Sequence, residues 1–144
     1  MKMIKYFLII CLSLVSIAST SQTVEGVWET YDHNSGALES DVKIYIKDGK
    51  LYGKTIKFYN AKESQNTAKC TLCKDYRKNQ PLVGMVFMTG LVKSGKEWKG
   101  SKVLLDPNNG KEYDGEVWLV SDDKLAVRGY LGWFYQTQYW KRKK

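Results

Sequence analysis

The sequence predicts an all-β protein: an eight-stranded, antiparallel, up-and-down barrel that follows an N-terminal signal peptide. Three observations support this fold class. Apolar residues recur with a period of two, short turn sequences separate the periodic runs, and no stretch after residue 21 has helical periodicity. Most successive strands are joined by short turns, so sequence neighbours should be antiparallel neighbours, and closure into a barrel removes exposed edges.

Size and composition limit the class of protein. The 144 residues suit one domain, and the 5 Trp, 10 Tyr and 4 Phe exclude intrinsic disorder. The formal net charge is +8, but lysines are spread along the chain and alternate with apolar residues. Nucleic-acid-binding proteins concentrate such charge in a patch. We therefore expect no nucleic-acid partner, and only weak attraction to anionic envelope surfaces.

Residues 1–21 have the three-part pattern of a secretory signal peptide. Lys2 and Lys5 precede an apolar run over 6–17, and small residues at 18–21 predict cleavage before Gln22. The apolar run is too short to span a membrane. The sequence therefore predicts an exported protein, periplasmic or secreted, with a single barrel domain over 22–144 and no transmembrane anchor after cleavage.

The first three strands are expected at 24–31, 41–48 and 51–59. In the second of these, Val42, Ile44 and Ile46 alternate with polar or amphipathic residues, which gives one buried and one solvent-exposed face. Asp48-Gly49 then marks a tight hairpin.

The remaining strands are expected at 83–92, 97–105, 112–120, 124–131 and 134–142. The run over 83–92 is almost continuously apolar, and every residue of the following 106–110 segment favours a turn. Alternation returns in 112–120, where Tyr113 and Val117 share the apolar face. The long connection over 60–82 is polar and contains both remaining cysteines, and no helix is expected after the signal peptide.

Cys70 and Cys73 are the first candidates for chemistry. In an exported protein, two cysteines at this spacing favour a structural disulfide that closes a tight loop. A redox-active dithiol is an alternative, although the surroundings lack the strand-then-helix pattern that lowers a thiol pKa. A zinc site is a second alternative, and His33 is the only histidine available to it.

Four residues near the two termini are predicted to have a structural role. The first and last strands of a closed meander are neighbours, so the guanidinium of Arg142 can stack on the indole of Trp28 and close one barrel end. Gly26 lets the chain bend tightly there, and Trp140 belongs to the same terminal motif. A Gly-x-Trp motif with a late arginine resembles the lipocalin and calycin barrels.

Arg128 and Tyr130 are candidates for binding a ligand. They share a strand face, and together they could clamp a carboxylate or phosphate, as the Arg-x-Tyr pair of the similar intracellular fatty-acid-binding barrels does. Tyr113 is a third candidate. Alternation opposes the clamp, because an inward-facing Val127 directs Arg128 and Tyr130 to solvent.

Enzymatic chemistry is disfavoured by the residues present. His33 lies in a turn-like stretch, and the carboxylate pairs lie on turns or on solvent-exposed strand faces. The sequence contains no glycine-rich loop of the kind that binds phosphate. We therefore expect no catalytic residues, no cofactor and no metal.

A series of short motifs resembles one known family over nearly all of 22–144. In order, these motifs are Gly26-x-Trp28, Asp48-Gly49-Lys50-Leu51-Tyr52-Gly53, Cys70-x-x-Cys73 with Pro81 and Gly84, Trp98-x-Gly100, Asp106-Pro107, Gly110-Lys111-x-Tyr113, Arg128-Gly129-Tyr130-x-Gly132 and Trp140-x-Arg142. The set resembles the exported bacterial domain family DUF2147. That resemblance implies a lipocalin-like β-barrel, and it implies no reaction. Trp133-Phe134 departs from the smaller residues typical after the Arg-Gly-Tyr motif.

Three functions follow from this barrel. The first is binding of a small apolar or amphipathic ligand or of an envelope component. The second is a structural or protein-interaction module whose barrel is filled by side chains. The third is thiol–disulfide activity through Cys70 and Cys73. The size of the barrel interior separates the first two, and the lability of the sulfur pair tests the third.

Overall fold

The computed structural model describes residues 22–144. The predicted signal peptide lies outside the described residues. Within 22–144, no helix has the length and apolar character needed to cross a membrane.

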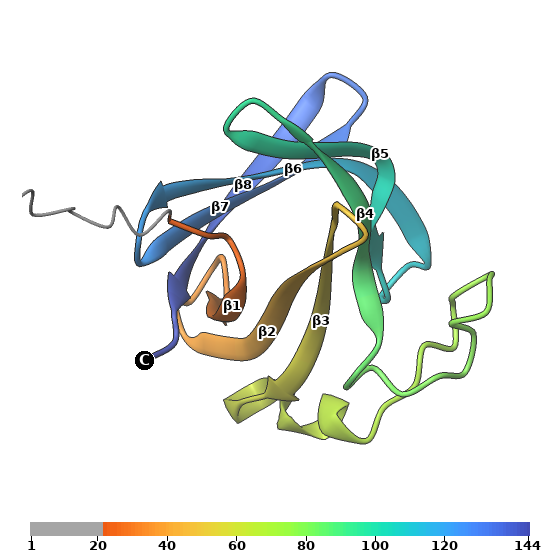
Figure 1. Ribbon diagram of the computed structural model, residues 1–144. Coiled ribbons are helices and arrows are strands. Elements are labelled where there is room, and N and C mark those ends of the chain that lie inside the picture. Colours follow the sequence, from red (N-terminus) through yellow and green to blue (C-terminus); the bar gives the residue numbers. More distant parts are fainter. Residues whose placement is uncertain (1–21) are drawn as a thin grey trace, which may run out of the picture.

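Eight antiparallel strands form one closed barrel in sequence order, as the sequence predicts (Figure 1). The strands are β1 (Gly26–Tyr31), β2 (Leu38–Lys47), β3 (Lys50–Phe58), β4 (Val86–Ser94), β5 (Glu97–Asp106), β6 (Lys111–Ser121), β7 (Lys124–Leu131) and β8 (Phe134–Arg142). Each strand pairs with the next, and β8 pairs with β1.

Two expectations about the β3–β4 connection are wrong. The connection contains the 3-10 helix η1 (Asn60–Asn66), where no helix was expected. The side chain of Asn66 fixes this turn by bonding to both backbone groups of Phe58, at 2.9 and 3.0 Å. The next strand begins at Val86 instead of residue 83, because Gly84 has a φ of +85°, which interrupts the extended backbone.

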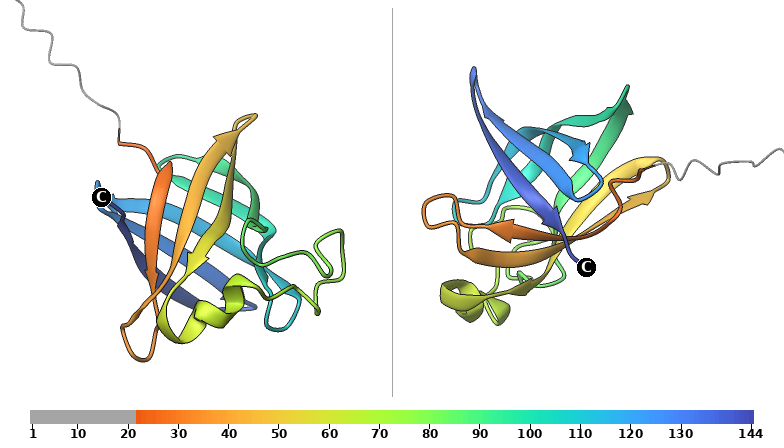
Figure 2. Two further views of the ribbon diagram at one scale, coloured as in Figure 1. Left: turned by 90° about the horizontal axis from the view of Figure 1, so that it is seen from below. Right: turned by 90° about the vertical axis from the view of Figure 1, so that its left-hand side faces the viewer.

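The up-and-down order gives the barrel two different ends. The connections β1–β2, β3–β4, β5–β6 and β7–β8 gather at one end, here called the mouth (Figure 2). The tight turns β2–β3, β4–β5 and β6–β7 gather at the other end, near the C-terminus. The long β3–β4 connection carries both cysteines and therefore lies at the mouth.

The end opposite the mouth is closed by Trp28 and Arg142, with Gly26 beside them. The Trp28 side chain is fully buried, and its indole N–H donates to the Val24 carbonyl at 2.9 Å. The Arg142 guanidinium carbon lies 4.2 Å from the Trp28 ring centroid. Gly26 has a φ of +135°, and a Cβ there would lie 2.8 Å from the Arg142 Nη1 atom. Only glycine gives the chain this close approach.

Arg142 also ties three backbone segments together at the closed end. Its guanidinium donates hydrogen bonds of 2.6–2.8 Å to the carbonyls of Asp122, Glu25 and Thr23. The arginine thus connects the β6–β7 turn to the segment that enters β1. The same side chain therefore covers the Trp28 ring and uses its guanidinium N–H groups to bond these carbonyls.

The seam between β1 and β8 is much shorter than the other pairings. Only Trp28↔Arg142 and Glu29↔Lys141 are in register across it, whereas β7 and β8 pair along eight residues. The pairing stops at Glu29, although β1 continues to Tyr31 and β8 begins at Phe134. Toward the mouth, the last residues of β1 and the first residues of β8 are therefore not joined by backbone pairing.

Candidate ligand cavity

The barrel interior opens at the mouth as a cavity of about 660 Å³. A ligand-binding pocket of a small-molecule carrier falls in the same size range. The barrel is therefore not completely filled by its own side chains.

The cavity has an apolar floor and a polar wall. Its floor and lower sides include Val42, Leu104, Val127 and Trp140, and Trp140 is buried. The lining also includes neutral polar side chains from β1, β2, β3 and β8, among them Thr30, Ser40, Thr55, Gln136 and Gln138. An interior of this kind can bury an apolar group and offer neutral hydrogen-bond partners to a polar one.

Charged side chains lie only among the rim residues of this lining. They are Glu39, Lys62 and Asp106, and none of them is buried. Lys62 Nζ lies 3.7 Å from Glu39 Oε1, so these two opposite charges form an ion pair. Burial of an unpaired charge is costly, and this interior offers no buried charged partner. The cavity favours a neutral or weakly polar occupant.

The interior clamp proposed for Arg128 does not form. Arg128 lies on the outer face of the barrel, where its guanidinium carbon is 4.2 Å from the Tyr135 ring centroid and 5.0 Å from that of Trp118. Its Nε–H donates to Thr137 Oγ1 at 2.8 Å. The neighbouring Val127 lines the cavity, so strand alternation decides the orientation against the clamp.

Tyr130 is also held by a partner other than Arg128. Its hydroxyl donates to Glu116 Oε2 at 2.5 Å, and this hydrogen bond raises the pKa of the tyrosine. Burial opposes ionisation of Glu116, but the Tyr130 hydrogen bond and the Lys99 charge prevail and lower the pKa of that carboxyl. Tyr130 therefore joins an outer polar network and contributes only to the rim of the cavity.

Tyr113 lies at the rim of the cavity. Its hydroxyl accepts a hydrogen bond of 2.9 Å from the Asn109 side-chain amide in the β5–β6 turn. Of the three candidate ligand-binding residues, Tyr113 and Tyr130 border the cavity and Arg128 does not. The glutamines of β8 were not predicted to line the cavity. Their period-two spacing was the available signal, since Gln136 and Gln138 alternate with Tyr135 and Tyr139.

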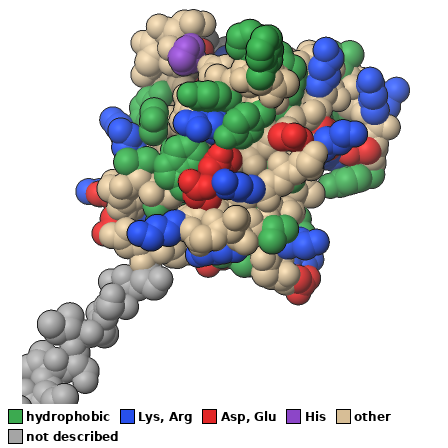
Figure 3. All heavy atoms as spheres, turned by 90° about the horizontal axis from the view of Figure 1, so that it is seen from above, with side chains coloured by type: hydrophobic (Ala, Val, Ile, Leu, Met, Phe, Trp, Pro, Cys, Tyr) green, Lys and Arg blue, Asp and Glu red, His purple; other side chains and the backbone are tan. Residues whose placement is uncertain are grey.

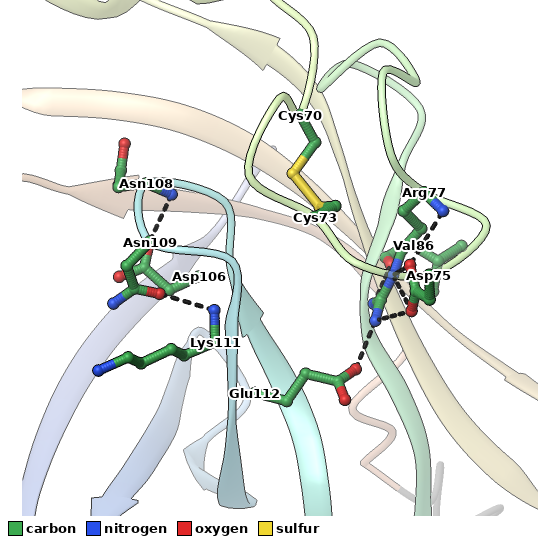
Figure 4. Close-up of a disulfide and its surroundings, with 10 residues drawn as sticks. All are labelled: Cys70, Cys73, Asp75, Arg77, Val86, Asp106, Asn108, Asn109, Lys111 and Glu112. Carbon is green, nitrogen blue, oxygen red and sulfur yellow. Dashed lines mark hydrogen bonds and ion pairs between the residues drawn. A yellow bond between two sulfur atoms is a disulfide. The ribbon is translucent and has the colours of Figure 1, made fainter.

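Cys70 and Cys73 form a disulfide in the β3–β4 connection (Figure 4). Both residues are at least 98% buried, and they pack with Leu82, Met85 and Leu105. A thiolate must reach a sulfur atom for exchange to occur, so this burial opposes a redox role. Disulfides are typical of oxidising compartments.

The disulfide loop packs directly against the β5–β6 turn. Gly110 has a φ of +69°, and a Cβ there would lie 1.9 Å from the carbonyl oxygen of Leu72. Any side chain at this position would push the two connections apart. Gly110 therefore allows the β5–β6 turn and the disulfide loop to pack in direct contact at the mouth.

Arg77 anchors the same connection to the barrel wall (Figure 4). Its side chain is 5% exposed, donates to the Val86 carbonyl at 3.1 Å, and forms ion pairs with Asp75 and Glu112. The hydrogen bonds from Arg77 lower the pKa of the Asp75 carboxyl. One guanidinium thereby joins the loop to β4 and β6.

Within residues 22–144, no group of three or more His, Cys, Asp or Glu side chains lies close enough together to hold a metal ion. His33 lies exposed in the β1–β2 connection at the mouth.

Comparisons with known proteins support the fold and the resemblance seen in the motifs. The family described as "Uncharacterized protein conserved in bacteria (DUF2147)" matches residues 26–142. A similar solved structure is that of protein HP1028 from Helicobacter pylori, which is described as belonging to the lipocalin family. It is 24% identical, with a TM-score of 0.70, over 85% of this chain and 84% of that one. No curated protein matches the chain.

Proposed function

This chain belongs to the DUF2147 family of uncharacterized bacterial proteins, and we propose that it binds a small, neutral, apolar or amphipathic molecule inside its barrel. The observation that carries the proposal is the open cavity of about 660 Å³ with an uncharged interior. The likeness to a protein of the lipocalin family agrees with a binding barrel at a coarse level. A barrel that is filled by its own side chains would not contain a cavity of this size.

The lining also indicates how a ligand would lie. The apolar floor around Val127 and Trp140 suits a hydrocarbon or aromatic portion, which gains free energy when it leaves water. Gln136 and Gln138 can donate and accept hydrogen bonds, and they suit a hydroxyl, amide or ester group nearer the opening. An ionised carboxylate would find no buried cation in the cavity wall.

The proposal can be tested by a substitution at Gly129 that places a leucine side chain in the cavity. This glycine lines the cavity and has no positive φ, and a Cβ there would meet Leu104 Cδ1 at 3.7 Å, an ordinary contact. Gly129→Leu should therefore fold normally while placing its side chain in the ligand volume. We expect the neutral fluorescent probe N-phenyl-1-naphthylamine to bind the wild-type protein, and to bind Gly129→Leu at least about tenfold more weakly.

The matched control adds the same side chain outside the cavity. Ser121 is an exposed residue at the end of β6, so Ser121→Leu should leave probe affinity unchanged. Thermal unfolding should show that both variants fold. Equal affinity of Gly129→Leu and the wild-type protein would contradict binding inside the barrel.

We also propose that the protein is exported to the periplasm or secreted. The pattern of residues 1–21 supports this proposal, and the Cys70–Cys73 disulfide is consistent with an oxidising compartment. The intact mass of the protein isolated from its producing bacterium should fit a chain that starts at Gln22. A mass that includes residues 1–21 would contradict cleavage.

A further inference from the structure

Strand β8 has one unpaired edge along most of its length. On one side it pairs with β7 from Phe134 to Lys141, without a register shift. On the other side only Lys141 and Arg142 pair with β1. Among the described residues, no strand therefore pairs with the 134–140 segment on its β1 side, and the β7–β8 hairpin projects from the barrel (Figure 2).

The direction of the backbone groups on this edge follows from two hydrogen bonds. The Lys143 N–H donates to the Val27 carbonyl on the β1 side, whereas the Arg142 N–H donates to the Asp123 carbonyl on the other side. Backbone groups of successive strand residues point to opposite edges. Tyr135, Thr137 and Tyr139 therefore direct their N–H and C=O groups toward the unpaired edge.

The sequence of this edge reads the same in both directions by residue type. Tyr135-Gln136-Thr137-Gln138-Tyr139 is a palindrome, and the aromatic residues Phe134 and Trp140 flank it. When a palindromic strand pairs antiparallel with a second copy of itself, like residues lie opposite each other. We propose that two copies of this protein associate through their β8 edges, with Thr137 of each chain on the twofold axis.

The proposed pairing agrees with the direction of the backbone groups on this edge and brings compatible side chains opposite each other. With Thr137 opposite itself, Tyr135 lies opposite Tyr139 of the other copy, and these three positions are the ones whose backbone groups face the edge. Each such pair exchanges two N–H···O bonds. Aromatic cross-strand pairs and Thr–Thr pairs stabilise antiparallel sheets. The contact is isologous and closes at two copies.

The outer side chains of β8 are already held in place for such a contact. Arg128 stacks on Tyr135 at 4.2 Å, and Lys124 lies 4.6 Å from the Tyr139 ring centroid. These cations approach from β7, away from the unpaired edge. Association would therefore cost less side-chain entropy than it would for mobile tyrosines.

The edge lacks the features with which proteins prevent strand addition. Residues 133–140 contain no charge and no proline, and Tyr135 and Tyr139 are 61% and 51% exposed. Exposed strand edges usually carry lysine or proline against self-association. In the view from above, hydrophobic side chains lie among Lys, Arg, Asp and Glu side chains (Figure 3).

The first test changes the charge at the proposed axis. Sedimentation velocity over a concentration series should show a dimer of the wild-type protein. Thr137→Lys and Thr137→Glu should each weaken self-association at least about tenfold, because like charges would lie directly opposite each other. An equimolar mixture of the two variants should restore the dimer. Ser121→Lys, at the closed end, should associate like the wild-type protein.

A second test measures the register and does not depend on charge. Hydrogen-bonded antiparallel pairs have a Cα–Cα distance of about 5.5 Å, which suits a disulfide. Thr137→Cys should therefore form a covalent dimer on mild oxidation, with residue 137 linked to itself in peptide mass spectra. Tyr135→Cys should not, since residue 135 faces residue 139. A monomer at all concentrations, or a dimer indifferent to both changes, would overturn the proposal.

Discussion

Replacing Trp28 by alanine is expected to lower the free energy of unfolding by about 3–5 kcal/mol, the range for deleting a large buried aromatic side chain. Small domains are stable by about 5–15 kcal/mol, so this loss is a large fraction of the total stability. The effect is large because Trp28 is fully buried and supports Arg142, which ties the β6–β7 turn to the N-terminal segment.

Urea unfolding followed by far-ultraviolet circular dichroism measures this effect. Trp28→Phe keeps a ring under the guanidinium and should lose less stability than Trp28→Ala. Trp133→Ala is the matched control, because Trp133 is 89% exposed at the tip of the β7–β8 hairpin. Its unfolding free energy should change by no more than about 0.5 kcal/mol. Equal stability of Trp28→Ala and Trp133→Ala would show that the end closure contributes little.

Replacing Arg77 by alanine is expected to release the β3–β4 connection from the barrel. The change removes a buried guanidinium and leaves two carboxylates and the Val86 carbonyl without their partner. Losing a hydrogen-bonded buried charge costs about 3–5 kcal/mol, but Asp75 and Glu112 are 42% and 37% exposed. Solvent screening reduces the loss, and we expect about 2 kcal/mol.

Limited proteolysis is the direct measurement, since a released connection is cut long before the barrel unfolds. Arg77→Lys keeps the charge but cannot form the same fork of hydrogen bonds, and it should give intermediate protection. Cleavage of Arg77→Ala at the wild-type rate would contradict an anchoring role.

The same contact should make the connection sensitive to acid. Arg77 lowers the pKa of Asp75 in the folded protein, so the pairing stabilises the fold fully above the unfolded pKa, which is about 3.9. That stabilisation is lost as the pH falls through the lowered, folded pKa. Protection of the wild-type connection from an acid-active protease should therefore decline below about pH 4, whereas Arg77→Ala should show no such decline from Asp75.

The strands and the closed end could be predicted from the sequence because both depend on local or terminal patterns. Alternation in Val42, Ile44 and Ile46 and the Asp48-Gly49 turn are decided by neighbouring residues, and the structure contains that hairpin. Alternation also predicted correctly that Arg128 faces outward, against its possible role in a clamp. η1 and the start of β4 were missed because the Asn66–Phe58 hydrogen bonds and the positive φ of Gly84 leave no trace in the period-two pattern.

Eight period-two segments, joined mostly by tight turns, were enough to predict an antiparallel meander with Trp28 and Arg142 meeting where its ends join. The length of that join does not follow from any local pattern and is seen only in the folded barrel. The pairing of β1 with β8 ends at Glu29, and this leaves the cavity wall of Gln136 and Gln138 next to an unpaired strand edge. The physical reason is that barrel closure depends on the twist and tilt of all eight strands together, which no local pattern specifies.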